Sequence, residues 1–155
     1  MKLLVSASIV AALASFQAPP APNPDFSGSW TIDSSRSQSS GTVTLEIKHT
    51  ATEISIETNK AGKISKVSYP LEPTPHVATE AIAAGHSHAY WRDKALVTET
   101  AGEIQGETVS FKQTRTLNGA GTEMIVESLT VVQHGYAAKD AKNYSSAKDV
   151  YVRAK

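Results

Sequence analysis

The feature that most constrains the fold is an alternation of apolar and polar residues with a period of two, which continues from residue 30 almost to the C-terminus. In one segment, Val43, Leu45 and Ile47 alternate with threonine, glutamate and lysine. This pattern is typical of β-strands that have one face in a core and the other in solvent. Turn-forming residues separate the segments, and Asn-Gly-Ala-Gly at 118–121 is the strongest hairpin signal.

About ten segments of strand length follow one another along the chain. They cover residues 30–32, 43–48, 53–57, 67–71, 76–82, 86–92, 95–101, 107–117, 122–133 and 148–154. We expect residues 139–147 to form a loop or one helical turn before the last strand. Consecutive strands with short links predict an all-β, up-and-down antiparallel β-barrel of about 8–10 strands. An immunoglobulin-like sandwich is the alternative, but it needs longer crossing connections than this sequence offers.

The N-terminal residues have the features of a secretory signal peptide. An apolar run over residues 3–14 follows Lys2, ends in small residues and is too short to span a bilayer. We expect residues 1–14 to be the signal peptide, residues 15–24 to be a proline-rich extended leader, and residues 25–155 to form one domain. The sequence has no cysteine, which excludes a lipoprotein anchor and favours a bacterial periplasmic or secreted protein over a disulfide-rich one.

Composition and motifs also bear on function. The chain has 15 Lys and Arg against 15 Asp and Glu, so its net charge is zero and nothing indicates nucleic acid as a partner. No Gly-x-Ser-x-Gly elbow is present. Carboxylate pairs such as Glu99 and Glu103 alternate with small polar residues, as on the solvated side of a sheet. We therefore expect a monomeric binding protein that is not an enzyme and has no cofactor.

Two segments carry a resemblance to a known family. Residues 26–30 read Phe-Ser-Gly-Ser-Trp, and residues 89–97 contain a Trp-Arg-Asp turn that leads into an alternating strand. On these residues the chain resembles the calycin superfamily, and more closely the small exported bacterial lipocalin-like domains. The resemblance implies a barrel that binds a small ligand and in which Trp30 closes the base. It also implies that Arg153, near the end of the last strand, stacks on Trp30 and so joins the two ends of the barrel.

The strand at 107–117 carries the candidate ligand contacts. Its apolar residues mark one face as the inner one, and that face also carries Phe111, Gln113 and Arg115. A buried cation needs an acidic side chain, ordered water or an anionic ligand as a partner. By analogy with fatty-acid-binding barrels, we expect these three residues and Tyr69 to contact a carboxylate-bearing lipid. The alternative places Arg115 at the barrel mouth, where it reaches solvent.

The alternation also predicts which apolar residues point inward. The predicted inner set is Leu45, Ile47, Ile54, Ile56, Val67, Leu96, Val109, Phe111, Val126 and Val150. A register slip of one residue would invert this set.

The histidines offer a second kind of site. His86 and His88 lie on one face of a predicted strand, and His76 on the preceding strand could supply a third nitrogen to a metal or haem. If Ala89 and Trp91 point inward, however, His86 and His88 point outward, which favours solvated histidines and no metal site.

Together these features predict an exported, periplasmic or secreted protein that binds or carries a small hydrophobic ligand, with an anionic lipid as one candidate. The first alternative is a structural or interaction domain of the envelope whose barrel is filled by its own side chains. The second is a metal or haem binder through His76, His86 and His88.

Overall fold

The computed structural model describes residues 22–72, 84–133 and 143–154. Its strands are β1 (Gly28–Ile32), β2 (Val43–His49), β3 (Glu53–Lys60), β4 (Lys63–Pro70), β5 (Ser87–Arg92), β6 (Ala95–Ile104), β7 (Glu107–Leu117), β8 (Glu123–Gln133) and β9 (Tyr144–Arg153). They form one nine-stranded sheet in the order β4-β3-β2-β1-β9-β8-β7-β6-β5, and each neighbouring pair is antiparallel. The described part of the chain has no helix long and apolar enough to cross a membrane.

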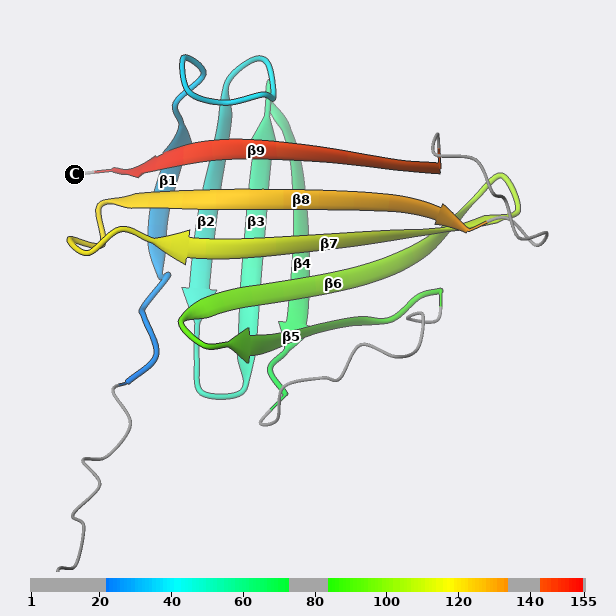
Figure 1. Cartoon of the computed structure of the whole chain (residues 1–155), viewed down its shortest axis with the longest axis horizontal. Coiled ribbons are helices and arrows are strands. Elements are labelled where there is room, and N and C mark those ends of the chain that lie inside the picture. Colours follow the sequence, from blue (N-terminus) through cyan, green and yellow to red (C-terminus); the bar gives the residue numbers. More distant parts are fainter. Residues whose placement is uncertain (1–21, 73–83, 134–142, 155) are drawn as a thin grey trace, which may run out of the picture.

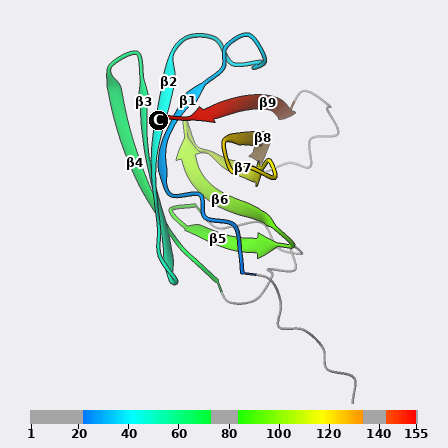
Figure 2. The ribbon, with the colours of Figure 1, turned by 90° about the vertical axis from the view of Figure 1, so that its left-hand side faces the viewer.

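The sheet curls into a nearly closed barrel with two walls. Strands β1–β4 form one wall, and β5–β9 run across it as the other (Figure 1). The pairing of β1 with β9 joins the walls along one side, where Figure 2 shows the two layers meeting. On the other side, a single parallel bridge between Leu71 and Ala89 links the end of β4 to β5. This architecture confirms the predicted up-and-down antiparallel barrel, and the continuous sheet contradicts the sandwich alternative.

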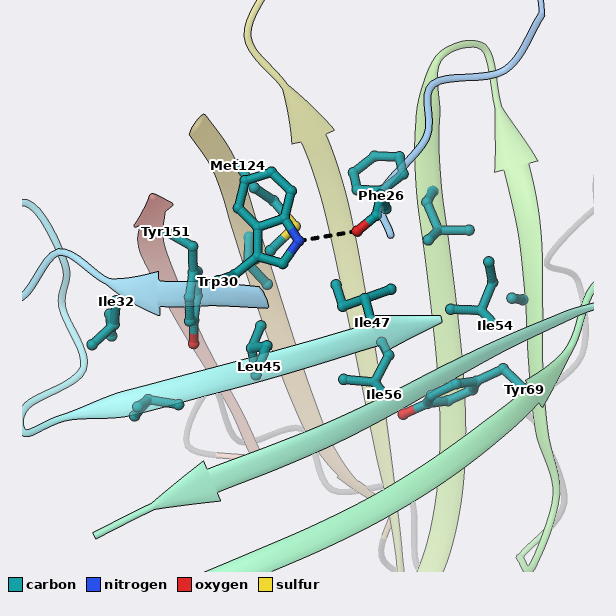
Figure 3. Packing of buried hydrophobic residues seen from close by; sticks show 14 residues of the cluster. Phe26, Trp30, Ile32, Leu45, Ile47, Ile54, Ile56, Tyr69, Met124 and Tyr151 are labelled. Carbon is teal, nitrogen blue, oxygen red and sulfur yellow. Dashed lines mark hydrogen bonds between the residues drawn. The ribbon is translucent and has the colours of Figure 1, made fainter. Parts of the chain in front are cut away.

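The core lies between the walls and follows the alternation of the strands. Trp30 of β1 is fully buried beside Leu45 and Ile47 of the same wall, Met124 of β8 packs on them from the opposite wall, and Figure 3 shows the four side chains together. Residues that were predicted to point inward, such as Val126, are mostly buried. The apolar surface that these residues remove from water is the main favourable contribution to the stability of the sheet.

Val150 departs from the predicted inner set. It pairs with Ile125, whereas its neighbours Asp149 and Tyr151 pair with the inward-facing Val126 and Met124. Val150 therefore lies on the outer face and is only half-buried. Val67 and Phe111 do lie on the inner face, but they are 37% and 44% exposed.

Two predicted segments differ in extent. Strand β9 begins at Tyr144, so residues 144–147 are part of a strand and not of the expected loop, which is a correction to the sequence prediction. The strand expected at 76–82 lies outside the described residues. The signal peptide at 1–14 and most of the leader also lie outside them.

Candidate ligand-binding site

One end of the barrel is closed by residues 26–30 and by the last strand. Trp30 is the register partner of Arg153 across β1 and β9, and the Arg153 guanidinium carbon lies 4.4 Å from the centre of the indole ring. The indole nitrogen donates a hydrogen bond of 3.0 Å to the carbonyl of Phe26, which is also fully buried (Figure 3). The expected contact between Trp30 and Arg153 is therefore present.

The closure between β1 and β9 requires a glycine at position 28. Its φ angle is +117°, a conformation that residues with a side chain rarely adopt. A Cβ atom at this position would also lie 3.2 Å from Nη1 of Arg153. Gly28 thus allows the Arg153 side chain to pass close to the backbone and reach Trp30.

Arg115 is the central polar residue of the barrel interior. It lies on β7 with its side chain inward and is only 2% exposed, so the alternative in which it reaches solvent is wrong. Its Nη1 donates a hydrogen bond of 2.7 Å to the hydroxyl of Thr98, and its Nη2 donates one to the side-chain carbonyl of Gln113. Its Nε is buried and has no hydrogen-bond partner, and no carboxylate of the described residues pairs with the guanidinium.

Two tyrosines from opposite walls approach this cation. Tyr69 of β4 and Tyr151 of β9 are both 7% exposed, and both lie close enough to influence the charge on Arg115. Burial lowers the pKa of Arg115 to about 10, against the opposing influence of the two tyrosines. Burial likewise raises the pKa of Tyr151 to about 12, and the neighbouring Asp149 contributes to that shift. At neutral pH the interior thus holds one guanidinium cation with two neutral hydroxyl groups near it.

The four residues predicted to bind a ligand do not lie equally close together. Gln113 accepts a hydrogen bond from Arg115. Burial raises the pKa of Tyr69, and the nearby Arg115 and Thr98 act in the opposite direction. Phe111 lies two residues from Gln113 on the same inner face of β7, but its side chain is 44% exposed. Its exposure shows that solvent reaches the interior at this end of the barrel.

The sequence prediction missed Thr98 and Tyr151 as members of this group. Thr98 lies two residues after the buried Leu96 on β6, so the two side chains point to the same face. Period-two reasoning could therefore have placed Thr98 on the inner face. Its bond to Arg115 depends on the register of β6 against β7, in which Thr98 pairs with Gln113. That register could not be read from the sequence of one strand.

His88 lies on the outer face of β5, as the inward orientation of Ala89 and Trp91 predicted. His88 has a side chain that is 13% exposed, and its Nε2 lies 3.4 Å from a carboxylate oxygen of Glu99. His86 is exposed, and His76 lies outside the described residues. Within those residues no group of three or more His, Cys, Asp or Glu is arranged to hold a metal ion.

Among the described residues, three grooves can be followed near the ends or on the outside of the barrel. The largest, of about 790 Å³, is bounded by the turns at 92–95 and 117–121. A second, of about 400 Å³, crosses the outer face of β7, β8 and β9, and a third, of about 410 Å³, lies beside His49 and Trp91. Arg115 does not line any of these three grooves, and its side chain is buried.

Comparison with known proteins adds a likeness at the level of the fold. No protein-family model and no curated protein sequence matches the chain. Among solved structures, the wild-type fluorescent protein UnaG is 14% identical, with 83% of this chain and 97% of that one covered and a TM-score of 0.47. A point mutant of UnaG gives 15% identity, coverage of 84% and 96%, and a TM-score of 0.49. The REP1-NXSQ fatty acid transporter gives 13% identity, coverage of 83% and 96%, and a TM-score of 0.40.

Proposed function

We propose that this protein binds a small hydrophobic molecule with an anionic head group inside the barrel, and that Arg115 is the residue that binds the anion. The observation that carries the proposal is the burial of a guanidinium without any described carboxylate partner. A lone buried cation is unfavourable, and an anionic ligand would offset that cost while the apolar walls hold the rest of the molecule.

The donor groups around Arg115 suit a carboxylate. The Nε of Arg115 has no hydrogen-bond partner, the Thr98 hydroxyl is bonded to the guanidinium, and Tyr69 and Tyr151 lie near its charge. A carboxylate is an acceptor-only group that can take several hydrogen bonds, and bonds from a charged donor are the strong ones. In this proposal the protein acts by binding and carries out no reaction.

The test compares a long-chain fatty acid with the fatty alcohol of the same length, using the wild type and Arg115→Met. A charge-assisted hydrogen bond contributes roughly 1.5–3 kcal/mol, so the variant should bind the acid about ten- to a hundred-fold more weakly. Its affinity for the alcohol should change much less. Arg92→Met, which removes an exposed cation from the outer face of β5, is the matched control and should bind both ligands like the wild type.

Two results would contradict the proposal. Equal affinity of wild type and Arg115→Met for the acid would make Arg115 a purely structural residue. Failure of the wild type to take up either ligand would instead favour the filled-barrel domain of the envelope.

We also propose that the protein acts outside the cytoplasm after export. The support is the short apolar run over residues 3–14, together with a chain that contains no cysteine. Expression of the full chain in a bacterial host, followed by mass measurement of the protein from the periplasm and medium, should show cleavage after Ala14. Recovery of the uncleaved chain from the cytoplasm alone would contradict export.

A further inference from the structure

The wall that carries Arg115 has a polar belt next to it. Strand register aligns Thr98, Gln113 and Ser128 in one row across β6, β7 and β8, and Thr100, Phe111 and Thr130 in the next row. Because side chains alternate along a strand, both rows share the inner face with Arg115. Five of these six side chains carry a hydroxyl or amide group, so this part of the inner face is polar.

The opposite wall is aliphatic at the level of the core. Ile47, Ile56 and Val67 align in one row across β2, β3 and β4, and Ile54 lies in the neighbouring row beside Tyr69. Figure 3 shows Ile47, Ile54 and Ile56 side by side, pointing to the same side of their strands. The two walls face each other (Figure 2), so the inner face of one wall is polar here and the inner face of the other is apolar.

Most residues of the polar belt are only partly covered by the described part of the chain. Thr100, Gln113, Ser128 and Thr130 are only half-buried, and Phe111 between them is 44% exposed. The Gln113 amide donates a hydrogen bond of 3.1 Å to the Ser128 hydroxyl, so this part of the belt is held in a fixed arrangement.

From this asymmetry we infer that the natural ligand is a carboxylate with hydroxyl or carbonyl groups along one side of its body and hydrocarbon along the other. The inference rests on the proposed function and names its ligand class. A saturated chain that covered the belt would remove water from these hydroxyl and amide groups without replacing their hydrogen bonds. A ligand with polar groups on that side replaces the water, and sites built to hydrogen-bond a hydroxyl discriminate strongly against analogues that lack it.

Matched pairs of ligands test the inference. Cholate and 5β-cholanate share a carboxylate and a ring system, and only cholate carries hydroxyl groups; 12-hydroxystearate and stearate form the corresponding flexible pair. We expect the wild type to bind the hydroxylated member of at least one pair about tenfold or more tightly than its partner, measured by calorimetry or Trp fluorescence.

Near-isosteric variants show which side chains cause the preference for the hydroxylated ligand. Thr100→Val with Thr130→Val should reduce the preference to about twofold or less while the variant still binds the unsubstituted acid. Thr116→Val, on the outward face of β7, is the matched control and should keep the full preference. The wild-type preference alone decides the inference if the double variant does not fold.

The outcomes separate this inference from the proposed function. If both members of each pair bind equally, or the unsubstituted acids bind more tightly, and Arg115→Met still weakens them all, the ligand class is wrong and the anion site stands. If no acid binds, or if binding is indifferent to Arg115→Met, both proposals are overturned.

Discussion

The guanidinium of Arg153 lies over the indole of Trp30 with 4.4 Å between its central carbon and the ring centre. The same guanidinium donates hydrogen bonds to the backbone carbonyls of Asp25, Ser27 and Gly121. One side chain near the C-terminus therefore holds together the segment before β1, the β7–β8 turn and the first strand. Such a joint between distant parts of the chain is what a barrel needs where its first and last strands meet.

We expect Arg153→Met to lower the free energy of unfolding by about 2–3 kcal/mol, because it removes a cation–π contact and three hydrogen bonds from a charged donor. Trp30→Ala should cost about 3–5 kcal/mol, since it leaves a cavity at a fully buried position. Urea unfolding measures both. Lys148→Met, which changes an exposed side chain of the same strand, is the control and should stay within about 0.5 kcal/mol of the wild type.

Alternation predicted most of the barrel because most strands have one face in the core, but β9 shows where the argument fails. Its last residues place valines at 150 and 152 on one parity and Tyr151 and Arg153 on the other. The valines suggested the wrong inner face. The expected contact between Arg153 and Trp30 requires Arg153 to point inward. Val150 is three residues away and so points to the opposite face, which means that an inward Val150 and the Trp30–Arg153 contact could not both be correct.

The candidate site was predictable only in part, for a different reason. Arg115 shares a face with the apolar residues of its own strand, so its inward direction follows from local sequence. Its neighbours Thr98 and Tyr151 come from other strands, and their proximity depends on how β6 pairs with β7 and β9 pairs with β8. Register is set by turns and by core packing of the whole sheet, which a single strand does not encode.

The corrected orientation of β9 gives a direct comparison of two valines. Val126 is 2% exposed on the inner face, whereas Val150 is half-buried on the outer face. Val126→Thr should destabilise the protein by about 1–3 kcal/mol because it buries a hydroxyl in an apolar core. Val150→Thr should cost less than about 1 kcal/mol. Equal losses in thermal or urea unfolding would show that the two positions are buried alike.

The outer face of the second wall makes stability depend on pH. Lys112 lies 2.6 Å from a carboxylate oxygen of Glu99, and the Tyr90 hydroxyl donates a hydrogen bond of 2.9 Å to the same carboxylate. Burial alone would raise the pKa of Glu99, but these bonds outweigh it and hold that pKa below its ordinary value of 4.5. The stabilisation is therefore present above pH 4.5 and is lost as the pH falls through the lowered pKa.

We accordingly expect Lys112→Met to destabilise the protein at pH 6–7 and to lose much of that effect as the pH falls below about 4. Chemical unfolding of the variant and the wild type across this range measures the difference. Lys94→Met, at an exposed turn position, should show no such pH dependence. A Lys112→Met effect that stays constant down to pH 3 would contradict the assignment of the stabilisation to the Glu99 carboxylate.

Arg115 should make the ligand-free protein less stable than it would be with an apolar residue. Burial lowers its pKa to about 10, so folding disfavours the cation, and this cost is fully present below pH 10 and is relieved only as the pH rises above it.

Arg115→Met removes the buried charge, although it leaves the Thr98 hydroxyl without its partner. On balance we expect the variant to be more stable than the wild type by about 1–3 kcal/mol without ligand. The gain should be constant between pH 6 and 9, where Arg115 is charged in both the folded and the unfolded chain. Saturation with a fatty acid should remove most of this advantage, because a ten- to hundred-fold tighter complex stabilises the wild type by about 1.4–2.7 kcal/mol more than the variant. If the variant is less stable than the wild type without ligand, Arg115 stabilises the ligand-free fold, and its burial is then not explained by anion binding.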